Sequence, residues 1–224
     1  MNLRQHFERL FNKLDLGVWG LIGSSVILIF VLSSIIGFKG QLGEPYSILN
    51  HFVSELGELG NSDLAFLCNL GLIIGGLIFA FYMLGLGLLV NNKWGKIGGG
   101  IGVFSSLSSG AVGFVPADIF LIAHGFFGMC YFISGLITTI IFQIAILTQK
   151  EERIPKSFIV GGTVLVAIYT IFLISAAWPD PYSVYNRPII WLDALFEWSL
   201  FFTVNGWLIF VSIYLVIKKP SDTL

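Results

Sequence analysis

The chain has 224 residues, of which 56% are hydrophobic and only 11% charged, and its formal net charge at pH 7 is -1. A soluble domain usually carries about 25% charged residues, so this composition argues against a soluble protein and favours an integral membrane protein. No basic face is available for nucleic acid, and membrane lipids are the partners that we expect. The length suits a single transmembrane domain.

Residues 1–16 are predicted to form an interfacial helix on the cytoplasmic surface of the membrane. Leu3, Phe7, Leu10 and Leu14 recur at helical spacing, with charged residues between them. A frayed polar start is the alternative. The apolar run that follows has no convincing cleavage site, so we expect a retained helix and no cleavable signal peptide.

Six segments are long and apolar enough to be predicted as membrane spans, since a span needs about 20 mostly apolar residues. The third and fourth are separated only by residues 116–118, where Pro116 suits the end of a helix. The predicted fold is therefore all-α: a multi-pass bundle of six transmembrane helices in the cell membrane. The predicted spans are residues 17–38, 64–90, 97–115, 119–147, 157–177 and 194–217.

Lysine and arginine predict the orientation of this bundle. Of the 12 such residues, all except Lys39 and Arg187 fall at the termini or in one alternate set of connections. Cytoplasmic connections are enriched in these residues, so both termini are predicted to be cytoplasmic. The outer connections are then residues 39–63, 116–118 and 178–193.

Polar residues gather at the predicted outer side. Three different spans place Asn69, His124 and Glu197 within about two turns of their outer ends, at about the same depth. Polar groups in lipid are unfavourable unless they face one another or water, so this match predicts an outward-facing polar pocket. The alternative is that Asn69 and His124 satisfy neighbouring backbone groups and Glu197 reaches water. The pocket candidates are Ser54, Glu55, Asn69, Asp118, His124, Asp193 and Glu197.

No complete catalytic or metal-binding motif accompanies these residues. Histidines and carboxylates are suitable zinc ligands, but no two of the three histidines have the spacing of a local site; we expect no metal and no cofactor. Ser54 as a nucleophile with a histidine base has little sequence support. Cys68 and Cys130 lie in apolar runs and are predicted to be free thiols. A proton-coupled transporter is disfavoured because the cytoplasmic halves of the spans lack ionisable residues.

Three short motifs resemble a known family. They are Val53-Ser54-Glu55-Leu56-Gly57, then Cys68-Asn69-Leu70-Gly71-Leu72, and finally Gly113-Phe114-Val115-Pro116 with His124 beyond it. The chain resembles the prokaryotic membrane family called domain of unknown function 998, whose members share a Ser-x-Leu-Gly loop, a Phe-Asn-x-Gly-Leu helix and a Gly-x-Phe-Pro turn followed by histidine. Here Cys68 stands where the family motif has phenylalanine.

The segment Asp193-Ala194-Leu195-Phe196-Glu197-Trp198 is also distantly similar to the final-helix motif of the eukaryotic DRAM/Frag/Sfk family. That resemblance implies a lipid-related role at the outer or luminal leaflet. The expected function is a lipid-interacting membrane protein with a polar pocket and no catalysis. The alternative is an outer-leaflet lipid-modifying enzyme, a hydrolase or transferase, that uses Glu55, His124 and Glu197.

Overall fold

A computed structural model describes residues 15–178 and 180–218 of the chain. The predicted interfacial helix at residues 1–16 lies, except for its last two residues, outside this part. The regular structure that is described is helical, apart from two isolated β-bridges. The elements are α2 (Leu16–Ser34), η1 (Ile35–Gly37), η2 (Val53–Gly57), α3 (Ala65–Val90), α4 (Lys93–Val112), α5 (Ala117–Thr148), α6 (Phe158–Ala176) and α7 (Leu192–Lys218).

Five of these helices, α2, α3, α5, α6 and α7, are long and apolar enough to cross a membrane. The all-α fold and the multi-pass character of the chain are therefore confirmed. The predicted third span overlaps α4, which has 20 residues but is rich in glycine and serine. That composition explains why α4 is less apolar than its neighbours and falls outside the set of five.

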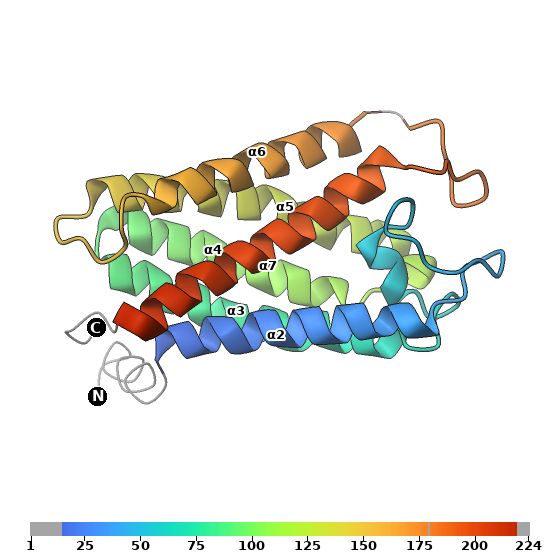
Figure 1. The fold of residues 1–224 in the computed structure, drawn as a ribbon, viewed down its shortest axis with the longest axis horizontal. Helices are drawn as coiled ribbons and strands as arrows, with labels where there is room; N and C mark the ends of the chain where they lie inside the picture. Colours follow the sequence, from blue (N-terminus) through green and yellow to red (C-terminus); the bar gives the residue numbers. More distant parts are fainter. Residues whose placement is uncertain (1–14, 179, 219–224) are drawn as a thin grey trace.

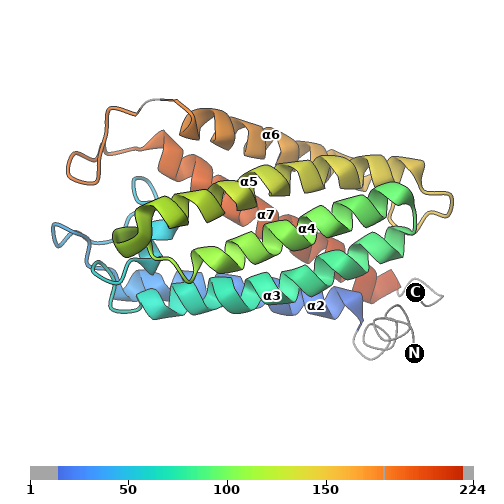
Figure 2. The same cartoon turned by 180° about the vertical axis from the view of Figure 1, so that it is seen from behind.

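The six long helices follow one another around a ring. Each packs against the next in the chain, and α7 packs against α2 to close the ring (Figures 1 and 2). We call the end that carries residues 35–64, 177–178 and 180–191 the η2 end, and the opposite end, where α2 begins and α7 ends, the terminal end. The ring leaves an interior that all six helices border.

Glycines allow the backbones of α3 and α4 to meet directly. A Cβ atom added to Gly76 would lie 2.7 Å from the Ser106 carbonyl oxygen and 2.8 Å from Gly110 Cα. Two other glycines of α3 face α2, since a Cβ at Gly71 would meet Phe30 and one at Gly75 would meet Ile27. Close approach of this kind gives membrane helices their dispersion contacts.

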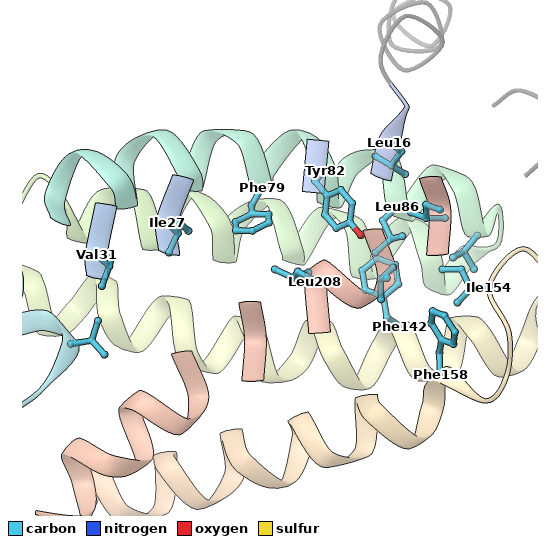
Figure 3. Packing of buried hydrophobic residues seen from close by; sticks show 14 of the residues in the cluster. Leu16, Ile27, Val31, Phe79, Tyr82, Leu86, Phe142, Ile154, Phe158 and Leu208 are labelled. Atoms are coloured by element: carbon cyan, nitrogen blue, oxygen red, sulfur yellow. The ribbon is translucent and has the colours of Figure 1, made fainter. Parts of the chain in front are cut away.

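The apolar core is densest toward the terminal end. Figure 3 shows Phe79, Tyr82 and Leu86 of α3 facing Leu208 of α7 and Phe142 of α5. A polar contact also lies within this region: the Ser212 hydroxyl donates to the Tyr82 hydroxyl at 3.2 Å. Aromatic and aliphatic side chains thus hold the terminal end of the ring together.

The half of α5 nearer the η2 end is packed much more loosely. None of residues 117–133 is buried, whereas Ser134, Gly135 and Thr138 farther along are. The helix also departs from helical geometry at Phe120 (φ -126°, ψ 49°). Helices α5 and α6 meet near their short connection and diverge toward the η2 end in both views (Figures 1 and 2). The wall of the ring is therefore weakest along this half of α5.

Replacing Gly76 with alanine is predicted to destabilise the bundle. The added Cβ meets backbone atoms of α4, which cannot rotate away, so the helices must separate. Overpacking of this kind typically lowers stability by about 1–3 kcal/mol. Thermal unfolding of the purified protein in detergent should show a lower Tm for Gly76→Ala. Gly100→Ala is the control, because nothing lies within 4 Å of its added Cβ; equal Tm values for the two variants would contradict the close α3–α4 packing.

Candidate functional site

A cavity of about 200 Å³ occupies the interior of the ring. Residues of η2 and of all six long helices line it, and most of the lining is apolar, including Phe79, Phe142 and Leu208. Three of the predicted pocket residues, Ser54, His124 and Glu197, lie on its wall. The cavity thus combines a long apolar interior with polar side chains that come from its η2 end.

Glu197 connects α7 to η2. Its Oε2 accepts a hydrogen bond from the Val53 backbone N–H at 2.8 Å, and the Ser54 backbone N–H also donates to this carboxylate. Both Val53 and Ser54 line the cavity together with Glu197. The carboxylate therefore holds the start of η2 against the bundle, where η2 forms part of the cavity wall.

His124 projects from the loosely packed half of α5. Its Nδ1 lies 2.8 Å from the Val115 carbonyl oxygen. Because a carbonyl oxygen can only accept, this nitrogen carries the proton, and Nε2 of the neutral ring is left as an acceptor. No hydrogen bond joins His124 to Ser54 within the described residues, so a serine–histidine pair is not assembled in this conformation.

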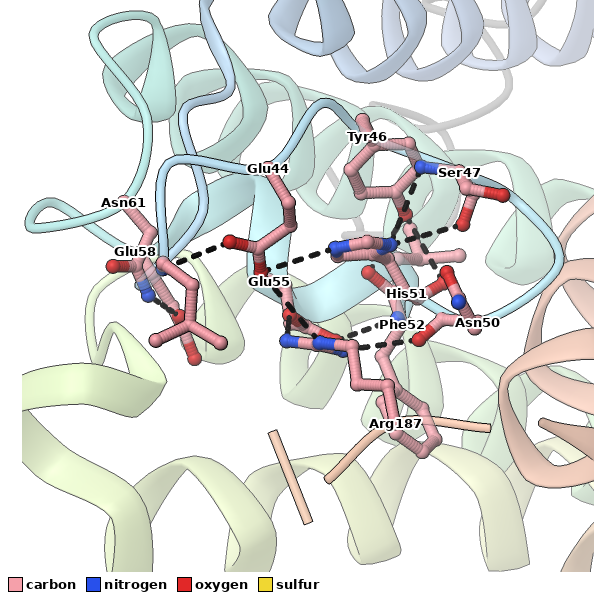
Figure 4. A network of polar contacts seen from close by, with 12 residues as sticks. Glu44, Tyr46, Ser47, Asn50, His51, Phe52, Glu55, Glu58, Asn61 and Arg187 are labelled. Carbon is pink, nitrogen blue, oxygen red and sulfur yellow. Dashed lines mark hydrogen bonds and ion pairs between the residues drawn. The ribbon is translucent and has the colours of Figure 1, made fainter. Parts of the chain in front are cut away.

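Glu55 faces away from the cavity and forms a buried ion pair with Arg187. Oε1 accepts from Arg187 Nη1 at 2.9 Å, and Oε2 accepts from Nη2 at 2.6 Å (Figure 4). The glutamate is 4% exposed and the arginine side chain 9% exposed. Glu55 Oε1 also accepts from the Phe52 N–H, and Arg187 Nη1 donates to the Asn50 carbonyl. Two connections that are distant in sequence are joined by these contacts.

Three further candidates bind neighbouring groups outside the cavity. Asn69 Nδ2 donates to the Gly57 carbonyl at 2.9 Å, and Asp118 Oδ2 accepts from the Gly60 N–H at 2.8 Å. The two side chains thus hold residues 57–60 between α3 and α5. Asp193 accepts a hydrogen bond from the Ser175 hydroxyl, which links α7 to α6. Asn69, like His124 at the Val115 carbonyl, thus bonds to a neighbouring backbone group.

Sequence reasoning missed several polar residues that the fold brings into play. Asn205 and Thr138 line the cavity, and Arg187, which the sequence marks only as a charge in an outer connection, pairs with Glu55. An asparagine in the middle of an apolar helix is itself an unusual feature, and this signal was available for Asn205. The partner of Arg187 is 132 residues away in the chain, so no local pattern indicates it.

The described residues contain no group of three or more histidine, cysteine, aspartate or glutamate side chains that could hold a metal ion. Cys68 and Cys130 are both free, and Cys68 is buried. The chemistry that the cavity offers is therefore a carboxylate, an imidazole and hydroxyl groups beside apolar walls.

Comparison with protein families matches residues 25–214 to the family described as "Protein of unknown function (DUF998)". The match covers most of the chain and all six long helices in whole or in part. Searches of the curated proteins and of the solved structures find no match. The distant similarity to the DRAM/Frag/Sfk family stays a prediction.

Glu58, which follows η2, predicts a pH dependence of stability. Burial raises the pKa of its carboxyl from 4.5 to about 7; the nearby Glu55 and Asp118 carboxylates add to this, whereas a hydrogen bond from Asn61 opposes it. The folded state thus binds a proton that the unfolded state has already released. Its stabilising contribution is present below pH 4.5 and is lost as the pH rises to about 7.

Glu58→Gln should remove this loss, because the amide stays neutral. We expect the Tm advantage of the variant over the wild type to grow between pH 4.5 and about 7 and to level off above that. Glu151→Gln, at an exposed glutamate of the terminal end, is the control. Parallel pH profiles for Glu58→Gln and the wild type would show that Glu58 is not buried as described.

Proposed function

Because the chain belongs to the DUF998 family of proteins of unknown function, we propose a function from the site itself: the protein binds a chain of a membrane lipid in its central cavity and catalyses no reaction. The observation that carries this proposal is the cavity of about 200 Å³ inside a closed ring of membrane-type helices. An apolar wall suits an acyl chain, since burial of apolar surface is favourable and non-directional. Ligand sites between the helices of bundles are common.

The position of the polar side chains supports a defined orientation of the lipid. Ser54, His124 and Glu197 line the cavity from its η2 end, while Phe142 and Phe158 line it toward the terminal end. An amphiphile would place its head group near the carboxylate and imidazole and its chain among the aromatic rings. The hydrogen-bonding groups of the head group would then meet the polar atoms that an acyl chain cannot satisfy.

The loosely packed half of α5 offers a lateral route for such a lipid. None of residues 117–133 is buried, and α5 diverges from α6 toward the η2 end (Figure 2). In this stretch, a Cβ atom added to Gly125 would have nothing within 4 Å, and one added to Gly128 would have only Phe132, at 3.9 Å. A lipid from the leaflet at the η2 end would reach the cavity here without crossing water.

This proposal includes six membrane-spanning helices. Both termini lie in the cytoplasm, and the η2 end lies at the external face of the cell membrane. Helix α4 lies between α3 and α5 in the ring, and its 20 residues reach about 30 Å, the thickness of a hydrocarbon core. Among the described residues, only Lys39 and Arg187 place cationic side chains at the η2 end.

Reporter fusions at residues 92 and 152 should report the cytoplasm, and a fusion at Gly43 should report the outside. The reverse pattern would overturn this orientation.

A second candidate function is an outer-leaflet lipid-modifying enzyme. The observation that favours it is the hydrogen bond from His124 Nδ1 to the Val115 carbonyl, which leaves Nε2 as a potential base on the wall of the cavity. Ser54 and Glu197 line the same cavity. Binding without catalysis is the better supported function because no nucleophile is hydrogen-bonded to that base in the described structure.

Filling the cavity tests the binding proposal. Gly128 lines the cavity, and its nearest neighbour, Phe132, lies 3.9 Å from an added Cβ; Gly100, on α4, is exposed, lies outside the proposed route and has nothing within 4 Å of an added Cβ. Gly128→Phe should exclude a photoreactive single-chain fatty amphiphile supplied in vesicles, reducing its crosslinking to cavity residues by about tenfold or more. Gly100→Phe is the control and should label like the wild type.

Equal labelling of both variants, with crosslinks mapping to the outer helix faces, would refute a lipid site in the cavity. The same preparations distinguish the second function. If the protein releases a modified lipid in vesicles and His124→Ala and Glu197→Gln lose that turnover while remaining folded, the protein is an enzyme and the non-catalytic proposal fails.

A further inference from the structure

A second hollow, separate from the central cavity, lies among the connections of the η2 end. It is bordered by residues 42–51 and 184–187 and has a volume of about 420 Å³. One water occupies about 30 Å³ in the liquid, so this space exceeds that of a single bridging water. It falls within the roughly 300–1,000 Å³ range of small-molecule sites. We call it the loop pocket.

Two of the side chains that line it are fixed by one polar atom and leave the other polar atom without a hydrogen bond. Glu44 Oε2 accepts a hydrogen bond from the Leu42 N–H at 2.8 Å, and Asn50 Nδ2 donates to the Pro188 carbonyl at 3.0 Å. Glu44 Oε1 and Asn50 Oδ1 are buried and make no hydrogen bond with the described protein. Since Asn50 uses its NH₂ group on a carbonyl, its unused atom is the acceptor.

His51 and Arg187 are fixed in a similar way. His51 is 2% exposed, and its ring packs against those of Phe38 and Tyr46, with ring centroids 5.1 and 5.0 Å away. Figure 4 shows Tyr46 beside it. Arg187 uses both terminal nitrogens on Glu55 and the Asn50 carbonyl. His51 Nε2 and Arg187 Nε are likewise buried and without a hydrogen bond.

These unused atoms converge. Glu44 Oε1 lies 3.5 Å from His51 Nε2 and 3.7 Å from Arg187 Nε. Such charge contacts are too long for hydrogen bonds, whose heavy atoms lie about 2.7–3.2 Å apart. Buried polar groups are nearly always paired in folded proteins, so four prepositioned and unused polar atoms around one hollow indicate a ligand.

The mixture of donors and acceptors selects the class of ligand. An anion would face the carboxylate of Glu44 and the amide oxygen of Asn50, with Glu55 close behind. A cation would lie beside the guanidinium of Arg187. A neutral hydroxyl group donates to the two oxygens and accepts from Arg187 Nε, and it fits either tautomer of His51.

Tyr185 lines the same pocket and is 71% exposed, so its ring adds an apolar face next to the polar atoms. A sugar ring combines hydroxyl groups with an apolar face of C–H groups. We propose that the loop pocket binds a sugar, either as the head group of a glycolipid or as a free saccharide, through Glu44, Asn50, His51 and Arg187. This site is independent of the lipid chain proposed for the central cavity.

Binding of defined sugars tests the proposal. The full-length protein is purified in a detergent without a sugar head group, because alkyl glycosides would compete. One arm measures saturation-transfer NMR and calorimetric titration with glucose, galactose and N-acetylglucosamine. The other arm measures binding to nanodiscs with and without a monoglycosyl diacylglycerol. Binding in the first arm identifies a free saccharide, and binding in the second arm alone identifies a glycolipid head group.

Glu44→Ala should weaken this binding by about tenfold or more, and its Tm is measured in parallel to show that the variant is folded. Asn50→Asp is the second variant: it keeps the shape but introduces a charge beside Glu44, and it should weaken binding as well. Glu151→Ala, at the terminal end, is the control and should bind like the wild type.

The proposal is overturned if the folded wild type shows no saturable binding in either arm, or if Glu44→Ala and Asn50→Asp bind unchanged. Competition by inorganic phosphate or by ethanolamine, in place of sugars, would assign the pocket to a charged ligand and would also overturn it. Gly128→Phe, which fills the central cavity, should leave sugar binding intact, so the two proposals fail separately.

Discussion

The buried ion pair between Glu55 and Arg187 holds the η2 end of the molecule together. Charges removed from water are stable only when their hydrogen bonds are satisfied, and here the guanidinium and carboxylate meet through two parallel bonds, with additional contacts to the Phe52 and Asn50 backbones. The pair joins the connection before α3 to the connection before α7. With it in place, η2 is held so that Val53 can bond to Glu197.

This arrangement connects η2 to both candidate sites: η2 lines the central cavity, and its Glu55 holds Arg187, which lines the loop pocket. On its inner side, Val53 and Ser54 line the central cavity. On its outer side, Arg187 uses its terminal nitrogens on Glu55 and leaves Nε to the loop pocket. The order of the connections thus determines the geometry of two sites that face different environments, one the interior of the bundle and the other the aqueous surface. A change that releases η2 is expected to alter both.

The sequence predicted the helices well and the site less completely, for physical reasons. The length and apolar composition of a segment largely determine whether it spans a membrane, and each predicted span overlaps a helix. Whether α4 spans the membrane is less evident from its composition, because its glycine and serine residues, which pack against α3, make it less apolar. The depth argument indicated His124 and Glu197, which do line the cavity. It could not show that the Asn69 side chain donates its hydrogen bond to the Gly57 carbonyl. The partner of Glu55 lies 132 residues away, and only the folded connections bring the two together.

A double-mutant cycle at Glu55 and Arg187 tests this account most directly. Thermal and denaturant unfolding of Glu55→Gln, Arg187→Gln and the double variant would be measured in the same detergent. Each single change leaves a buried charge unpaired and is predicted to destabilise the protein by about 3–5 kcal/mol. The double variant should be clearly less destabilised than the sum of the two, because it leaves neither charge behind. Additive effects of the two substitutions would contradict the claim that this pair organises the η2 end.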